Sequence, residues 1–168
     1  DADNDGLKDN AETGYATVKL YLHKYDSINM VCVLIDSTTT NPDGDYLFDS
    51  LEAGIYLIEV AQSNFLMGNP LYGTASSTGT NGSATGPYEG GPFLGDVDTI
   101  DSDDNGMHIP GMGVWSDSIR LFGGEPLADT ADLDDNSGAL NEHSNLAVDF
   151  GFYTLHSIGN TLFVDVDN

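Results

Sequence analysis

Positive charge is scarce in this 168-residue chain, which has four Lys and Arg residues against 28 Asp and Glu and a net charge of −24. That imbalance excludes nucleic acid and anionic membrane surfaces as partners, because phosphates and acidic lipids would be repelled. Long hydrophobic runs are also missing, since no apolar stretch reaches the roughly 18 residues of a membrane-spanning segment. We therefore expect neither nucleic-acid binding nor membrane insertion.

Cysteine and glutamate are rare as well. The single cysteine, Cys32, excludes an internal disulfide, and its apolar surroundings predict a small buried side chain. The acidic residues are 22 Asp and 6 Glu, and aspartate is the shorter, loop-compatible oxygen ligand. This bias favours cation-binding loops. A hydrophobic content of 39% separates the chain from disordered acidic sequences.

What is present is a series of short segments in which apolar residues occupy every second position or form brief runs. This pattern predicts β-strands, and turn residues such as Asp43-Gly44 separate them. The expected fold is all-β, a sandwich of antiparallel sheets. Between residues 62 and 113 the alternation is lost, which predicts a long irregular connection held in place by ions. The candidate strands are 16–23, 29–36, 46–48, 56–60, 146–152 and 158–164.

Residues 1–12 match the calcium-loop pattern D-x-[DN]-x-[DN]-G-x5-E at every fixed position. Aspartates at alternate positions supply oxygens, the glycine permits a sharp turn, and the final glutamate closes the shell. Because a strand pattern follows at residue 16, the loop is expected within a β framework and not between two helices. The predicted ligands are Asp1, Asp3, Asp5, the backbone carbonyl of Leu7, Asp9 and Glu12.

A second, incomplete loop begins at residue 101 and has Gly106 at the turn position. Met112 stands where the closing carboxylate belongs, so that ligand is expected from elsewhere, and an ordinary turn is the alternative. A third acidic cluster at 132–136 lacks the glycine. The candidate ligands of these regions are Asp101, Asp103 and Asn105 with Asp96 or Asp98, and Asp132 with Asp134.

The two ends of the chain are similar to each other. The last four residues, Asp165-Val166-Asp167-Asn168, repeat the Asp-x-Asp-Asn pattern of residues 1–4. A strand precedes this motif at the end of the chain and not at its front. We interpret residues 1–156 as the calcium-binding sandwich, and 157–168 as a strand that begins the next repeat or is donated to a neighbouring subunit.

The order of these motifs resembles the SdrD B-like domains, the serine–aspartate-repeat B-type modules of bacterial surface proteins, which are related to the collagen-adhesin B-type domain. The resemblance implies an immunoglobulin-like, prealbumin-like sandwich in a secreted or cell-surface protein, where it acts as a calcium-stiffened spacer in an array of repeats. The matching segments are 1–12, 18–21, 43–48, 54–56, 63–65, 101–106, 124–126, 144–152, 158–160 and 163–165.

One segment departs from the family order. In the family, Ile-Gly-Asn opens the domain ahead of the calcium loop, whereas Ile158-Gly159-Asn160 lies near the end of this chain. We hypothesise that strand 157–164 docks on the next subunit or repeat by strand addition, which makes another copy the partner. Such a head-to-tail contact does not close on itself and would build a fibre.

No pattern in the sequence predicts catalysis. The four histidines lack metalloprotease spacing, no nucleophile elbow is present, and ion ligation explains the paired carboxylates. We therefore expect a structural protein and not an enzyme. The alternative is an adhesive module that binds glycans or another cell-surface protein, with outward Tyr21 and Trp115 as the candidate platform.

Overall fold

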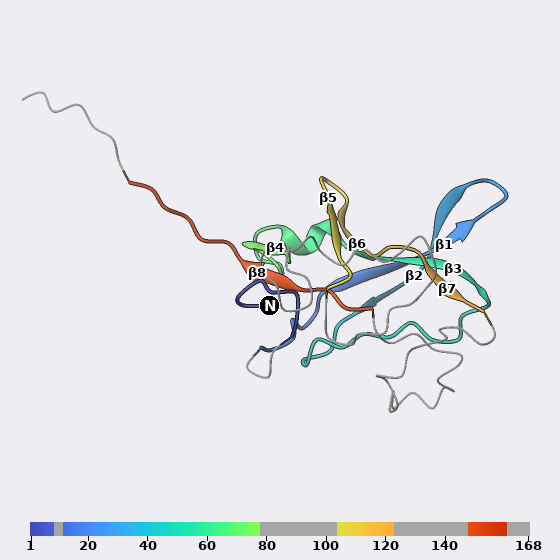
Figure 1. Cartoon of the computed structure of the whole chain (residues 1–168), viewed down its shortest axis with the longest axis horizontal. Coiled ribbons are helices and arrows are strands. Elements are labelled where there is room, and N and C mark those ends of the chain that lie inside the picture. The colour runs from blue at the N-terminus through green and yellow to red at the C-terminus, as the bar shows by residue number, and fades with distance from the viewer. Residues whose placement is uncertain (9–11, 78–103, 123–147, 161–168) are drawn as a thin grey trace, which may run out of the picture.

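A computed structural model describes residues 1–8, 12–77, 104–122 and 148–160 of the chain. Within these ranges the fold is an all-β sandwich of antiparallel sheets, which confirms the predicted fold class (Figure 1). Its one helical element there is a short 3-10 turn, η1 (Gln62–Phe65). The same ranges contain no helix with the length and hydrophobicity that a membrane span requires.

Among the described residues the larger sheet has six strands, and β7 pairs with one end of β3 while β6 pairs with the other. The smaller sheet has two strands within the same residues. In spatial order the larger sheet contains β2 (Val31–Thr39), β1 (Lys19–Asp26), β3 (Gly54–Val60), β6 (Gly113–Trp115) and β5 (Met107–Ile109), with β7 (Ile119–Leu121) beside β3. The smaller sheet contains β4 (Thr74–Ser76) and β8 (Phe152–Thr154).

The predicted alternation on the central strands forms the core. Leu20 of β1 pairs with Val60 of β3, and Leu22 pairs with Ile58, so these four side chains share one buried face. Phe152 of the smaller sheet belongs to the same cluster. Because each fully buried leucine contributes about 2 kcal/mol, this face holds the two sheets together.

Buried polar side chains fix the places where the central strands end. The side chain of Asn64 accepts a hydrogen bond from the Lys19 N–H at 2.9 Å and donates to the Lys19 carbonyl at 2.8 Å. The hydroxyl oxygen of Thr40 accepts a bond from the Val18 N–H at 2.9 Å. These contacts satisfy backbone groups that burial removes from water.

The expectation of an irregular connection from 62 to 113 is wrong for its described parts, which contain η1, β4 and β5. Strands of three residues are too short to show an alternation, and their partners lie far away in the sequence, as in Ala75 with Tyr153. At Gly113 the φ is +87°, and a Cβ would meet the carbonyl oxygen of Val60 at 2.3 Å. The close approach of β6 to β3 therefore depends on glycine.

Strand β2 lies at the edge of the larger sheet, and almost all of it is exposed. Cys32 is exposed with it, so the prediction of a buried cysteine is wrong. In the described part of the chain β2 has a strand neighbour, β1, on one side alone. Figure 1 shows residues 155–160 leaving the sandwich at the opposite end from the β1–β2 turn.

Candidate metal centre

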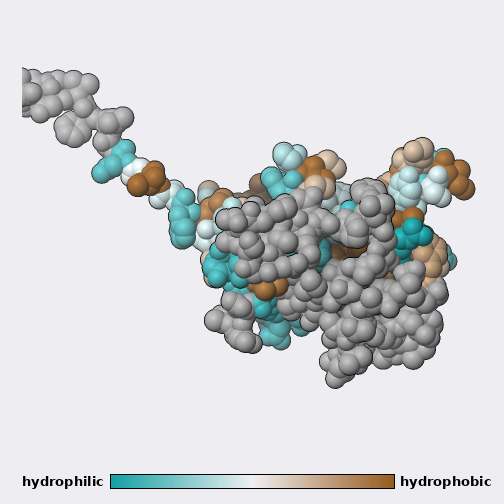
Figure 2. Space-filling model, viewed as in Figure 1, coloured by the Kyte–Doolittle hydropathy of each residue, from teal (hydrophilic) through white to brown (hydrophobic). Residues whose placement is uncertain are grey.

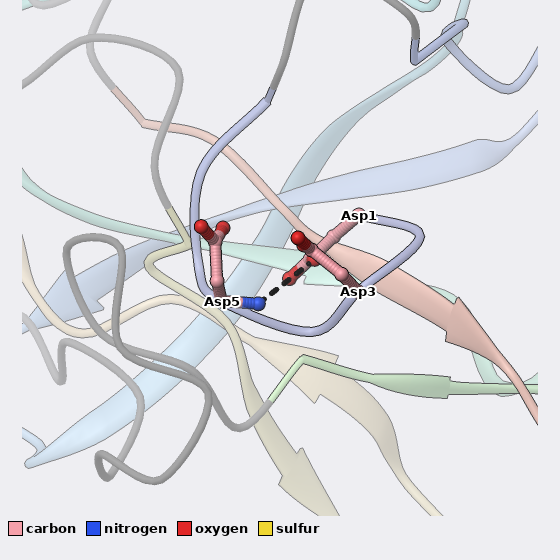
Figure 3. Close-up of side chains that lie close together, drawn as sticks. All are labelled: Asp1, Asp3 and Asp5. Atoms are coloured by element: carbon pink, nitrogen blue, oxygen red, sulfur yellow. Dashed lines mark hydrogen bonds between the residues drawn. The ribbon is translucent and has the colours of Figure 1, made fainter.

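The amino-terminal loop brings three predicted ligands together. One carboxylate oxygen from each of Asp1, Asp3 and Asp5 lies within 4.8 Å of the others (Figure 3). The Asp1 carboxylate accepts hydrogen bonds from the backbone N–H groups of Asp5 and Gly6, both at 3.1 Å. Gly6 has a φ of 83°, which glycine adopts without a steric penalty. The alternate spacing in the sequence therefore produces a compact group of carboxylates.

Two further members of the motif stabilise the loop. The Leu7 N–H donates to the Asp5 carboxylate at 3.0 Å. Glu12 reaches back to the start of the loop, where its carboxylate accepts a hydrogen bond from the Ala2 N–H. Among the described residues, Glu12 closes the loop without belonging to the group of three carboxylates. Asp9 lies outside the described residues.

The donor set has the chemistry of a site for a hard cation. All three clustered side chains offer carboxylate oxygens, which suit Ca²⁺ and Mg²⁺ better than metals that prefer nitrogen or sulfur. At a separation of 4.8 Å, two unit negative charges repel by about 1 kcal/mol in water and about 3.5 kcal/mol at an effective dielectric constant of 20. The residues present therefore fit a divalent cation.

The second predicted loop is described from Asp104 onward. Asn105 is buried, its side-chain oxygen accepts a hydrogen bond from the Asp149 N–H at 2.7 Å, and its own N–H donates to the Asp149 carbonyl at 2.9 Å. These two bonds tie the loop to the segment that precedes β8. The predicted ligands Asp96, Asp98, Asp101, Asp103, Asp132 and Asp134 lie outside the described residues.

Asp104 is a buried carboxylate that the sequence analysis did not select. Its Oδ1 accepts hydrogen bonds from the N–H groups of Gly106 at 3.0 Å and Gly151 at 2.9 Å. Its Oδ2 is buried and has no hydrogen-bond partner in the described structure. Burial raises the pKa of Asp104 to about 7, and the charge of Asp149 adds to the rise. A buried oxygen without a donor is suited to a cation or a proton.

Ser77 connects the two loops. Its hydroxyl donates toward the carboxylate of Asp1, and its backbone N–H donates to the Gly151 carbonyl at 2.9 Å. Because the Gly151 N–H donates to Asp104, a continuous series of hydrogen bonds joins Asp1 to Asp104. A Cβ at position 151 would lie 3.0 Å from the Cβ of Ser77, so a larger residue there would require Ser77 to shift by a few tenths of an ångström.

The candidate aromatic platform lies on the outer face of the larger sheet, where Glu59 pairs with both Tyr21 and Trp115. The Trp115 ring lies 4.6 Å from the ring of His23, and its indole N–H donates to the Met112 carbonyl at 2.8 Å. Both aromatic side chains are half-buried. The hypothesis of a glycan platform stays a prediction.

A comparison with family models adds an independent finding. The model described as the SdrD B-like domain matches residues 1–89, just over half of the chain. The matched segment includes the amino-terminal loop and strands β1 to β4. No curated protein and no solved structure matches the chain.

Proposed function

Because the chain belongs to the SdrD B-like domain family, a family of structural modules in bacterial surface proteins, we propose that it is a calcium-stiffened spacer, stalk or fibre subunit outside the cell. The observation that carries the calcium part of this proposal is the convergence of three carboxylates within 4.8 Å in a loop of matching spacing. Members of the family are structural modules and not enzymes.

The ion would be held by Asp1, Asp3 and Asp5, with Leu7, Asp9 and Glu12 as the further ligands that the motif predicts. Bound Ca²⁺ supplies the positive charge that offsets the mutual repulsion of these carboxylates. The protein's own contribution is the fixed loop. Hydrogen bonds of Ser77 and Gly151 then connect Asp1 with the buried Asp104, so a fixed position of the Asp1 carboxylate restrains the position of Asp104.

A second cation at the loop that begins at residue 101 is supported by the buried, unpaired Oδ2 of Asp104 in the described structure. Keeping an isolated carboxylate ionised in a buried site is costly, and a nearby cation removes that cost. The pairing of Asn105 with Asp149 fixes the end of this loop on the segment that precedes β8.

A calorimetric titration of calcium into chelator-treated protein tests the proposed metal site. We expect Asp5→Asn to weaken binding at the amino-terminal loop at least tenfold, because it removes one of the clustered negative charges and leaves only a neutral amide oxygen as a ligand. The matched control is Asp43→Asn, which makes the same change at an exposed turn outside the loop. Equal affinities for all three proteins would contradict the assignment.

For assembly, we propose that residues 157–164 add a strand to an adjacent copy, which is either another subunit or the next repeat in the same polypeptide. Ile158 is fully exposed, as expected for a side chain whose burial is provided by a partner. The contact is heterologous, so its repetition gives an open linear array.

A further inference from the structure

The hairpin formed by β1 and β2, residues 19–39, is electrically neutral within a chain of net charge −24. Its two lysines, Lys19 and Lys24, balance Asp26 and Asp36, and residues 27–35 have no charged side chain. Two copies of an acidic protein repel each other over most of their surfaces. At the neutral hairpin this repulsion is reduced.

The same hairpin exposes a continuous series of large apolar side chains. Isolated exposed apolar residues are common, but a contiguous patch on a soluble protein is typical of an interaction site. Figure 2 shows hydrophobic residues where the hairpin projects from the body. The series comprises Ile28, Met30, Val31, Val33, Leu34 and Ile35, which are between 45% and 89% exposed.

The first part of the β2 edge has little protection against pairing with another strand. Exposed sheet edges normally carry lysine, proline or a β-bulge, and β2 has neither lysine nor proline and has its bulge only beyond Leu34. Residues 31–34 pair with β1 in regular register, because the bulge in this pair lies beyond Leu34. The outer edge of this segment is therefore regular in register, apolar and uncharged.

We propose that β2 pairs antiparallel with β2 of a second copy, which joins two six-stranded sheets across a two-fold axis. A second copy fits because it supplies an equally neutral and apolar edge, whereas an acidic or basic strand would leave charges unpaired against it. Antiparallel pairing centred on residues 32–34 places the two Asp36 side chains on opposite sides of the axis. The projecting hairpin also keeps the acidic bodies apart (Figure 1).

This contact is distinct from the proposed calcium site and from the proposed strand addition by the tail. The tail leaves the sandwich at the end opposite to the hairpin, and β2 contains none of the predicted ligands (Figure 1). The tail contact extends an array, while the β2 contact joins two chains laterally. An experiment can therefore disprove the β2 contact without bearing on the tail contact, and the reverse also holds.

Disulfide trapping tests the pairing directly. When a strand pairs antiparallel with its own copy, one residue lies directly opposite the same residue of the other copy. The reason is that in each directly opposed pair the backbone N–H and C=O groups of both residues point either toward the partner strand or away from it. We expect mild oxidation to produce a covalent dimer for at least one of three proteins: wild type with Cys32, Cys32→Ser with Val33→Cys, and Cys32→Ser with Leu34→Cys. The matched control is Cys32→Ser with His108→Cys, on the exposed β5 edge of the same sheet.

A charge variant provides a second readout in the Ile158→Asp background, which removes the tail contact. We expect dimers in sedimentation velocity, and Val33→Lys should raise their dissociation constant at least tenfold because it places like charges across the axis. Val33 is 47% exposed, so the monomer fold should persist, as circular dichroism can check. The proposal would be overturned if the Ile158→Asp protein were already monomeric without Val33→Lys. It would also be overturned if a cysteine at position 108 gave as much covalent dimer as the cysteines at positions 32–34.

Discussion

Removing calcium should lower the melting temperature by roughly 5–11 °C for each ion lost. An ion present at about 100 times its dissociation constant, such as 1 mM calcium over about 10⁻⁵ M, stabilises the folded chain by about 2.7 kcal/mol. For a domain of this size, 1 kcal/mol corresponds to about 2–4 °C. The reason lies in the amino-terminal loop, where the carboxylates of Asp1, Asp3 and Asp5 converge and repel each other when no cation is bound.

Scanning calorimetry in calcium and in chelator measures this shift. Asp43→Asn should respond to chelator as the wild type does. Asp5→Asn should lose about half or more of the response of the amino-terminal loop, because tenfold weaker binding removes about 1.3 kcal/mol of the stabilisation. Magnesium should restore less stability than calcium, because it requires stricter geometry and gives up water reluctantly. A melting temperature that is identical in calcium and in chelator would refute metal-linked stiffening.

Ile158→Asp should abolish head-to-tail polymers while leaving the fold of the monomer unchanged. Burial of an isoleucine on the partner contributes about 2 kcal/mol, and a buried, unpaired aspartate adds a further cost. The association constant should therefore fall at least 30-fold. The monomer should tolerate the change, since Ile158 is fully exposed and lies beyond β8.

The matched control is Ser157→Asp, which adds the same charge to the neighbouring residue. Successive residues of a strand face opposite sides, so this side chain would point away from the acceptor if Ile158 points toward it. Electron microscopy and sedimentation should find polymers in the wild type and in Ser157→Asp, and monomers or lateral dimers in Ile158→Asp. Polymers that survive Ile158→Asp would exclude the tail as the donated strand.

The sequence predicted the central strands, whose signal is local. The strand prediction is wrong for residues 46–48 and for the described residues 158–160. Leu20 with Leu22, and Tyr56 with Ile58, alternate because a central strand buries every second residue. The same reasoning identified β2 as a strand but predicted a buried Cys32. Strand periodicity does not reveal how many neighbours a strand has, and the exposure of β2 follows from its edge position. The short β6 and β7 were missed because their three residues show no period.

The candidate site likewise contains residues that the sequence predicted and residues that it did not. Asp1, Asp3 and Asp5 were predicted as a group because their convergence depends on a turn within one short loop. Asp104 and Ser77 were missed because their partners are distant in the sequence. Ser77 meets Asp1 only after β4 has paired with β8, and Asp104 is enclosed only when that pairing brings Gly151 beside it. No local motif marks either residue.

An anomalous difference map from crystals grown in millimolar calcium is the most direct test of the metal centre. The map should show a calcium peak between the carboxylates of Asp1, Asp3 and Asp5, and the peak should be absent from crystals of the same protein grown in chelator. If the wild-type loop is ordered and saturated with calcium in solution but its three carboxylates point apart with no peak between them, the calcium assignment is wrong.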